Sequence, residues 1–96
     1  MIKEKVAFVT GSSRSIGLGV AVKLAREGYA VAMNSRQSAE TVKEAVDLVK
    51  ACGNPVLYLQ GDLASTQDRD RMVKQLMQEF GRIDLLVNNA GLALGL

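Results

Sequence analysis

The sequence predicts an α/β fold built on a parallel sheet, because two kinds of apolar pattern alternate along it. Four short apolar runs are separated by three longer segments in which apolar residues recur at helical spacing. The short runs are continuously apolar, as in parallel strands that helices cover on both faces. A β-α-β-α-β-α-β order of this kind gives a parallel sheet with right-handed crossovers. We expect one domain, 1–96, because 96 residues are too few for two.

The first strand is expected at 5–10, and the first helix begins near Ser15. The residues that predict its buried face recur every four positions, with small neighbours beside them: Ile16, Val20 and Leu24, flanked by Gly17 and Ala21. Gly28 suits the C-terminal cap of this helix. The second strand is expected at 30–34.

Ser38 is expected to cap the second helix, with Glu40 in the first turn, where an acid is favourable. The expected buried side of this helix is Val42, Ala45, Val46 and Val49. Residues 53–55, Gly-Asn-Pro, end it, and the third strand follows at 56–60. All three helices are expected to be about 12–16 residues long.

Ser65 or Thr66 is expected to cap the third helix, and Gly81 ends it. Its expected core side is Met72, Val73, Leu76, Met77 and Phe80. The fourth strand is expected at 83–87. The tail 92–96 is apolar and carries neither a charge nor a cap, which is typical of a chain cut in the middle of its architecture.

Composition excludes several classes of function. The net charge of +2 and the small number of aromatic residues argue against a nucleic-acid partner. The sequence contains no His and only one Cys, Cys52, which leaves no Cys/His metal cluster and no internal disulfide. No apolar run approaches the roughly 18 residues of a membrane helix, and the N-terminus does not read as a signal peptide. We therefore expect a cytoplasmic protein with no membrane contact.

The turn after the first strand is the feature most indicative of a ligand. A strand, a glycine-bearing turn and a helix leave backbone N–H groups unpaired at the positive end of the helix dipole, where a phosphate binds readily. The usual Gly-x-Gly-x-x-Gly fingerprint is absent, because Gly17-Leu18-Gly19 is followed by Val20, Ala21 and Val22, with no third glycine. The turn alone therefore leaves two interpretations: a diphosphate cradle, or a tight turn that only packs a helix on a strand.

Three motifs together resemble the short-chain dehydrogenase/reductase family. Residues 10–17, Thr-Gly-Ser-Ser-Arg-Ser-Ile-Gly, resemble its Thr-Gly-x-x-x-Gly-x-Gly turn, and 88–91, Asn-Asn-Ala-Gly, match its motif after strand four. Residues 62–63, Asp-Leu, stand where the family has an Asp-hydrophobic pair. The region is similar to bacterial 3-oxoacyl-carrier-protein reductases. The resemblance implies a truncated Rossmann fold: a four-stranded parallel sheet in order 3-2-1-4 with three crossover helices.

The resemblance also implies a site for a nicotinamide dinucleotide. Its residues would be Gly11, Ser13, Arg14, Ser15, Ile16, Gly17, Arg36, Asp62, Leu63, Asn89, Ala90 and Gly91. Asp62 would accept a hydrogen bond from the adenine amino group beside Leu63, residues 89–91 would border the ribose, and Asn88 would brace neighbouring strands. Ser15 replaces the middle glycine of the family turn, so its side chain would either crowd the diphosphate or donate a hydrogen bond to it.

The end of the second strand favours NADP(H) over NAD(H). NAD sites usually place an acid there for the ribose 2′-hydroxyl, whereas an Arg accommodates a 2′-phosphate. No acid follows this strand until Glu40, whereas Arg36 and the turn residue Arg14 offer guanidinium groups. The other interpretation is that both arginines are simply solvated.

The family's catalytic Ser and Tyr-x-x-x-Lys are absent, because the residues four positions after Tyr29 and Tyr58 are Met33 and Asp62. We therefore name no catalytic residue and expect an NADP(H)-binding segment of an oxidoreductase that is inactive alone. The alternatives are a non-enzymatic nucleotide-binding module and a truncated module that only self-associates. The fourth strand would lie at an exposed apolar edge, which predicts a homo-oligomer that associates through this strand or through the tail.

Overall fold

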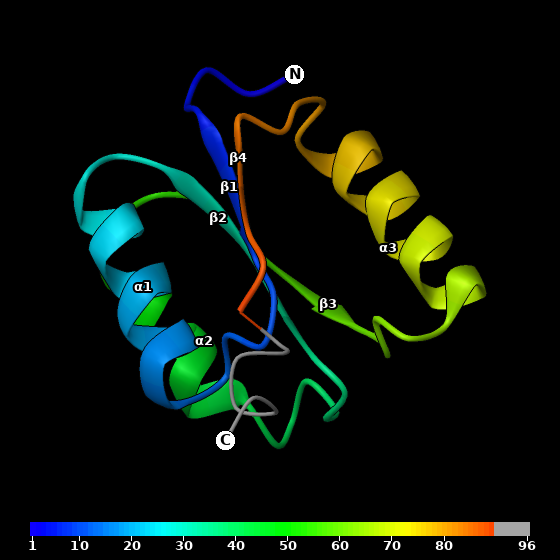
Figure 1. Ribbon diagram of the computed structural model, residues 1–96. Helices are drawn as coiled ribbons and strands as arrows, with labels where there is room; N and C mark the ends of the chain where they lie inside the picture. Colours follow the sequence, from blue (N-terminus) through cyan, green and yellow to red (C-terminus); the bar gives the residue numbers. More distant parts are fainter. Residues whose placement is uncertain (90–96) are drawn as a thin grey trace.

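The computed structural model of the protein describes residues 1–89, and it confirms the predicted topology. Its elements are β1 (Val6–Val9), α1 (Ser15–Arg26), β2 (Ala30–Ser35), α2 (Lys43–Lys50), β3 (Val56–Gln60), α3 (Thr66–Glu79) and β4 (Leu85–Val87). The four strands form one parallel sheet in the order β3-β2-β1-β4 (Figure 1). The expectations for Ala90, Gly91 and the tail 92–96 lie outside the described residues.

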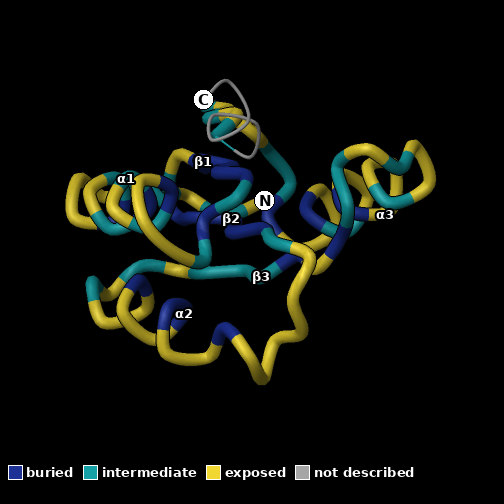
Figure 2. Tube along the Cα trace, turned by 60° about the horizontal axis from the view of Figure 1, so that its bottom comes forward, coloured by how far each residue is buried: buried dark blue, intermediate teal, exposed yellow. Residues whose placement is uncertain are grey.

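The sheet separates two apolar cores. Helices α1 and α2 cover one face of the sheet and α3 covers the other (Figures 1 and 2). Strand β1 serves both cores, since Val9 packs with the α1–α2 side whereas Val6 and Phe8 pack with Met72 and Leu76 of α3. A strand buried on both faces needs apolar residues at successive positions, which explains the unbroken run at 6–9.

The expected buried face of α1 is wrong. Ile16, the first residue of the expected stripe, is 68% exposed, and the buried positions are the small ones: Gly17, Ala21 and Ala25. Helix-to-sheet distance depends on the side chains at the contact, so small residues let α1 lie close to the strands. The larger Val20 and Leu24 are only half-buried at the edge of the contact.

The start of α2 also differs from the expectation. The helix has only eight residues and begins at Lys43, with Val42 at its N-cap position. The Ser38 hydroxyl instead accepts a hydrogen bond from the Thr41 N–H, at 3.3 Å, in the preceding turn. The expected length of 12–16 residues is therefore wrong for this helix, since Ser38 caps a separate turn.

Helix α3 begins as expected and packs through a narrower stripe. The Ser65 hydroxyl caps it by accepting the Asp68 N–H at 3.2 Å. Residues spaced by four, Met72, Leu76 and Phe80, are buried. Val73 and Met77, expected in the core, are 43% and 44% exposed, because each lies one position round the helix from the buried stripe.

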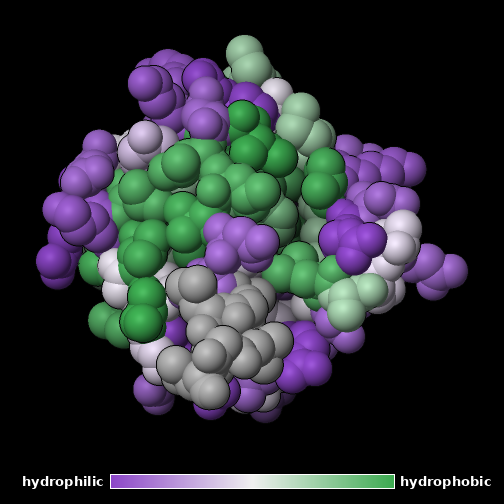
Figure 3. All heavy atoms as spheres, in the orientation of Figure 1, coloured by the Kyte–Doolittle hydropathy of each residue, from purple (hydrophilic) through white to green (hydrophobic). Residues whose placement is uncertain are grey.

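Strand β4 is the edge of the sheet, as predicted. It pairs only with β1 within residues 1–89, and its register is held by Asp84, whose carboxylate accepts the Val6 N–H at 2.8 Å. Leu86 of this strand is 60% exposed. Figure 3, which has the orientation of Figure 1, shows apolar side chains gathered on the face turned toward the viewer. An unpaired strand edge with exposed apolar side chains is a surface on which another chain segment can pair.

No helix in the described part of the chain, residues 1–89, is long and apolar enough to span a membrane.

Candidate functional site

The turn between β1 and α1 presents open N–H groups at the start of a helix. The first backbone bond of the helix runs from the Leu18 N–H to the Arg14 carbonyl at 3.2 Å. No acceptor within residues 1–89 takes the N–H groups of residues 15–17. These groups lie at the positive end of the α1 dipole, where an anion is stabilised.

Gly17 allows the start of α1 to pack closely against this turn. A Cβ at Gly17 would lie 2.5 Å from Asn89 Nδ2 and 2.9 Å from the Gly11 carbonyl carbon, and nearer still to the Gly11 carbonyl oxygen. Asn89 closes the turn from the other side, since its Nδ2 donates to the Gly11 carbonyl at 3.0 Å. Only a residue without a side chain fits here, so Gly17 lets the start of α1 pack directly on the turn. The same contacts show Asn89 bracing the glycine turn, a function that the sequence did not predict for it.

Ser15 occupies a backbone conformation that suits glycine. Its φ is +54°, and within residues 1–89 it is the one non-glycine residue with positive φ. The side chain is exposed at the start of α1, beside the open N–H groups. The substitution of the family glycine therefore preserves the glycine-like backbone and adds a hydroxyl at the rim of the cradle.

Asn34, near the end of β2, joins the turn after β1 to the end of β3 through its hydrogen bonds. The sequence alone did not lead us to identify it. Its Oδ1 accepts the Gly11 N–H at 3.3 Å, and its Nδ2 donates to the Leu59 and Gly61 carbonyls at 3.0 and 3.2 Å. Its backbone N–H and carbonyl both bond Ser12. The available signal was a polar residue that directly follows the apolar run 30–33. A buried polar residue needs partners, and here they lie at the ends of the two strands that flank β2, namely β1 and β3.

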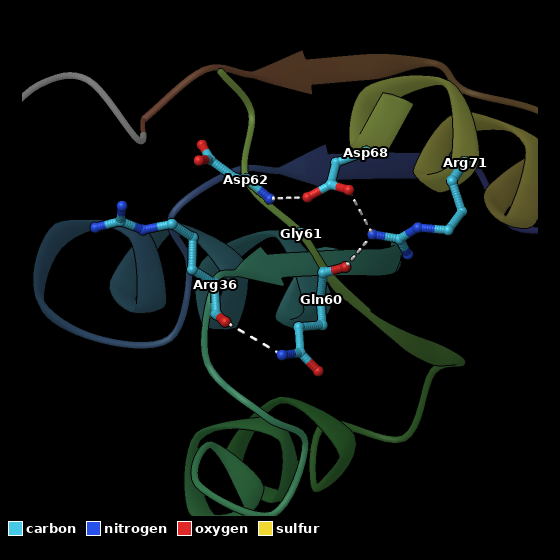
Figure 4. A pocket seen from close by; sticks show the side chains of 6 residues that line it. All are labelled: Arg36, Gln60, Gly61, Asp62, Asp68 and Arg71. Atoms are coloured by element: carbon cyan, nitrogen blue, oxygen red, sulfur yellow. Dashed lines mark hydrogen bonds and ion pairs between the residues drawn. The ribbon is translucent and has the colours of Figure 1, made fainter. Parts of the chain in front are cut away.

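A second part of the site is a hollow at the ends of β2 and β3, shown in Figure 4. It is lined by Arg36, Gln60, Gly61, Asp62, Asp68 and Arg71. The Asp62 carboxylate accepts the Ala64 N–H at 2.9 Å. Neither Arg36 nor Arg14 forms an ion pair within residues 1–89, and both are exposed.

Asp68 is the carboxylate with the most partners in this hollow. The Asp62 N–H donates to its Oδ2 at 2.8 Å, and Arg71 lies 3.4 Å from its Oδ1. These partners lower the pKa of Asp68, the hydrogen bond from the Asp62 N–H being the largest cause. The carboxylate is therefore ionised throughout the neutral range.

The structure brings most of the predicted residues to one edge of the sheet. Gly11, Ser15, Gly17 and Asn89 surround the first turn, and Arg14 and the half-buried Ser13 belong to the same segment. Arg36 and Asp62 line the hollow, and the half-buried Leu63 follows Asp62. Ile16 is exposed beside the turn. Ala90 and Gly91 lie outside the described residues.

An open helix start and a glycine turn at the carboxyl edge of a parallel sheet define a Rossmann-type α/β protein. The sequence profile of the family described as "short chain dehydrogenase" matches residues 5–95. The chain therefore belongs to the short-chain dehydrogenase/reductase family.

Curated relatives are reductases about three times as long. Hydroxynaphthalene reductase arp2 of Aspergillus fumigatus is 39% identical over 91 residues, which are 95% of this chain and 33% of that protein. A 3-oxoacyl-acyl-carrier-protein reductase of Staphylococcus aureus is 42% identical over 92 residues, 96% of this chain and 37% of the relative. The chain thus spans about a third of the length of the curated relatives it matches.

Solved structures include relatives with nicotinamide cofactors. A Brucella melitensis 3-oxoacyl-acyl-carrier-protein reductase in complex with NAD is 38% identical, with a TM-score of 0.86 over 95% of this chain and 35% of that one. L-Sorbose reductase from Gluconobacter frateurii, complexed with NADPH and L-sorbose, is 40% identical, with a TM-score of 0.86 over 94% of this chain and 34% of that one. Each of these two relatives was solved with a bound nicotinamide dinucleotide.

Proposed function

We propose that this chain is the NADP(H)-binding N-terminal segment of a cytoplasmic oxidoreductase that transfers hydride between the nicotinamide and a carbonyl or alcohol substrate. The observation that carries the proposal is the set of open N–H groups at residues 15–17, held against the strand ends by Gly17. The cofactor supplies the hydride chemistry. The residues of this chain bind and orient it.

The proposed roles follow the two parts of the site. Residues 11–17 form the diphosphate cradle, in which the open N–H groups of residues 15–17 are the donors and the Ser15 hydroxyl adds a donor at the rim. Asp62 accepts the adenine amino group, with Leu63 against the ring. Residues 89–91 border the nicotinamide-side ribose.

The arginines favour NADP(H). Arg36 follows β2 and lines the hollow that contains Asp62, where the adenosine ribose would lie. Its guanidinium has no competing carboxylate in an ion pair within residues 1–89, so it is free to bind a 2′-phosphate. Arg14 at the glycine turn is a second cation for the same group. The solved relatives include both an NAD and an NADPH complex, so the preference is a property of these side chains rather than of the family.

Calorimetric titration of the chain with NADPH and with NADH tests this proposal. We expect NADPH to bind about tenfold more tightly, since a charge-assisted pair with the 2′-phosphate is lost with NADH. Arg36→Ala should reduce the difference, with Arg14 retaining the remainder, and leave NADH affinity unchanged. Arg26→Ala, which removes an exposed cation at the far end of α1, is the matched control. If neither NADPH nor NADH binds, the proposal is contradicted.

The 96 residues alone should not catalyse hydride transfer, because the Tyr-x-x-x-Lys element is absent from them. Measurable turnover of a carbonyl substrate by the purified chain contradicts this expectation.

The exposed β4 edge supports a second candidate function, that of a self-associating module. Leu86 is exposed on the strand edge, and parallel sheets are normally covered. Two copies that pair along β4 would each cover the exposed β4 edge of the other. This candidate requires no nucleotide, so titration and sedimentation separate it from the first.

A further inference from the structure

Three side chains of α3 bond the backbone of the segment that joins β3 to α3, and two of them, Asp68 and Arg71, are shown in Figure 4. The third, Arg69, donates from Nη1 to the Leu63 carbonyl at 2.5 Å. Arg71 Nη2 donates to the Gln60 carbonyl at 2.9 Å, and Asp68 Oδ2 accepts the Asp62 N–H at 2.8 Å. Asp68 and Arg71 also form an ion pair, with 3.4 Å between Oδ1 and Nη2. The backbone on both sides of Gly61 is therefore tied to one charged pair.

Gly61, between these two points, brings the backbone of the turn close to side chains of α3. A Cβ at Gly61 would lie 2.8 Å from Met72 Sδ and 3.1 Å from Arg71 Nη2. The Gly61 N–H donates to the Ser35 carbonyl at 2.9 Å, which attaches the turn to β2 as well. Asp68 is itself fixed, since its N–H bonds the Ser65 cap.

The position of the Asp62 carboxylate depends on this backbone. Its own hydrogen bond is local, to the Ala64 N–H two residues along the chain. Such a local bond orients the side chain relative to the turn but does not place the turn relative to Arg36. The bond from the Asp62 N–H to Asp68 is the one that ties the backbone of Asp62 itself to a side chain of α3, whereas Arg71 and Arg69 bond its neighbours Gln60 and Leu63.

We propose that Asp68, paired with Arg71, is a positioning residue that places the Asp62 carboxylate for the adenine amino group of the cofactor. The inference rests on the proposed function, because it assigns Asp62 to the adenosine end of the nucleotide. Asp68 acts through Asp62 and does not itself touch the ligand.

A double-mutant cycle on the 96-residue chain tests this role. We expect Asp68→Ala to weaken NADPH binding about tenfold, as for loss of a charge-assisted hydrogen bond. In an Asp62→Ala background the same substitution should have no further effect, because the group it positions is gone. Asp70→Ala is the matched control, since Asp70 is exposed on the same helix and its side chain has no hydrogen bond or ion pair within the described range. The free energy of unfolding is measured by urea denaturation for every variant.

The possible outcomes separate the two proposals. A wild-type chain that binds no NADPH refutes the proposed function itself. Wild-type binding with unchanged affinity in Asp68→Ala overturns the positioning role, as does an equal loss in both Asp62 backgrounds, which only a general structural effect would give. If Asp68→Ala does not fold, Asp68→Asn takes its place in the cycle. It retains an acceptor oxygen without the charge, so we expect a loss of about threefold that again disappears with Asp62→Ala.

Discussion

Gly17→Ala is the substitution that tests the glycine turn most directly. The added Cβ would lie 2.5 Å from Asn89 Nδ2 and 2.9 Å from the Gly11 carbonyl carbon, whereas real Cβ atoms essentially never come within 3.0 Å of such atoms. One neighbour is backbone and the other is held by a 3.0 Å hydrogen bond to Gly11, so neither can move freely. The start of α1 must therefore separate from the turn.

The expected cost combines three effects. Overpacking costs about 1–3 kcal/mol, and loss of the Asn89–Gly11 hydrogen bond adds about 1 kcal/mol. Alanine has a higher helix propensity than glycine, which offsets up to about 1 kcal/mol of this cost. We expect Gly17→Ala to lower the free energy of unfolding by about 2 kcal/mol, a large part of what a chain of this size has. Movement of the turn should also weaken NADPH binding.

Gly19→Ala is the matched control in the same helix. A Cβ at Gly19 has no atom within 4 Å, so only the propensity gain remains and stability should rise by about 0.5–1 kcal/mol. Urea denaturation followed by circular dichroism measures both variants. If Gly17→Ala is as stable as Gly19→Ala, the close approach of α1 to the turn is not present in solution, and the reasoning about the cradle is refuted.

Three further predictions concern backbone conformation, acid stability and association. Ser15→Gly should raise the free energy of unfolding by about 1 kcal/mol, because φ is +54° there; an unchanged urea midpoint argues against that conformation. Hydrogen bonds from Arg82 and then from the Val6 N–H lower the pKa of Asp84 from 3.8 to about 2, so its contribution to stability is present above pH 4 and is lost as pH falls toward 2. Asp84→Asn should therefore be less stable than wild type at pH 6 and converge with it near pH 2, and urea midpoints that differ equally at both pH values would contradict this. Leu86→Lys should reduce concentration-dependent association in sedimentation velocity, and a wild-type chain that is monomeric at all concentrations refutes association through β4.

The fold was predictable because its signals are local. Continuous apolar runs at 6–9 and 30–33 identify strands covered on both faces, and glycines at 28, 53 and 81 end the helices with positive φ. Order along the chain then sets the topology through right-handed crossovers.

The features that were predicted wrongly or missed depend on distances across the molecule. Periodicity places Ile16 and Gly17 on adjacent parts of α1 but does not say whether large or small side chains face the strands. That choice is made by how closely the helix approaches the sheet. Ser38 has the sequence of a helix cap, yet it caps a turn that ends before Lys43. The partners of Asn34 are 22–38 residues away along the chain, which no local pattern reveals.

The carboxamide of Asn34 holds the Gly11 N–H through its oxygen and the Gly61 carbonyl through its nitrogen. A planar group of fixed length therefore links the turn after β1 to the turn after β3. A substitution that shortens or reshapes this one side chain would alter the spacing of both turns at once.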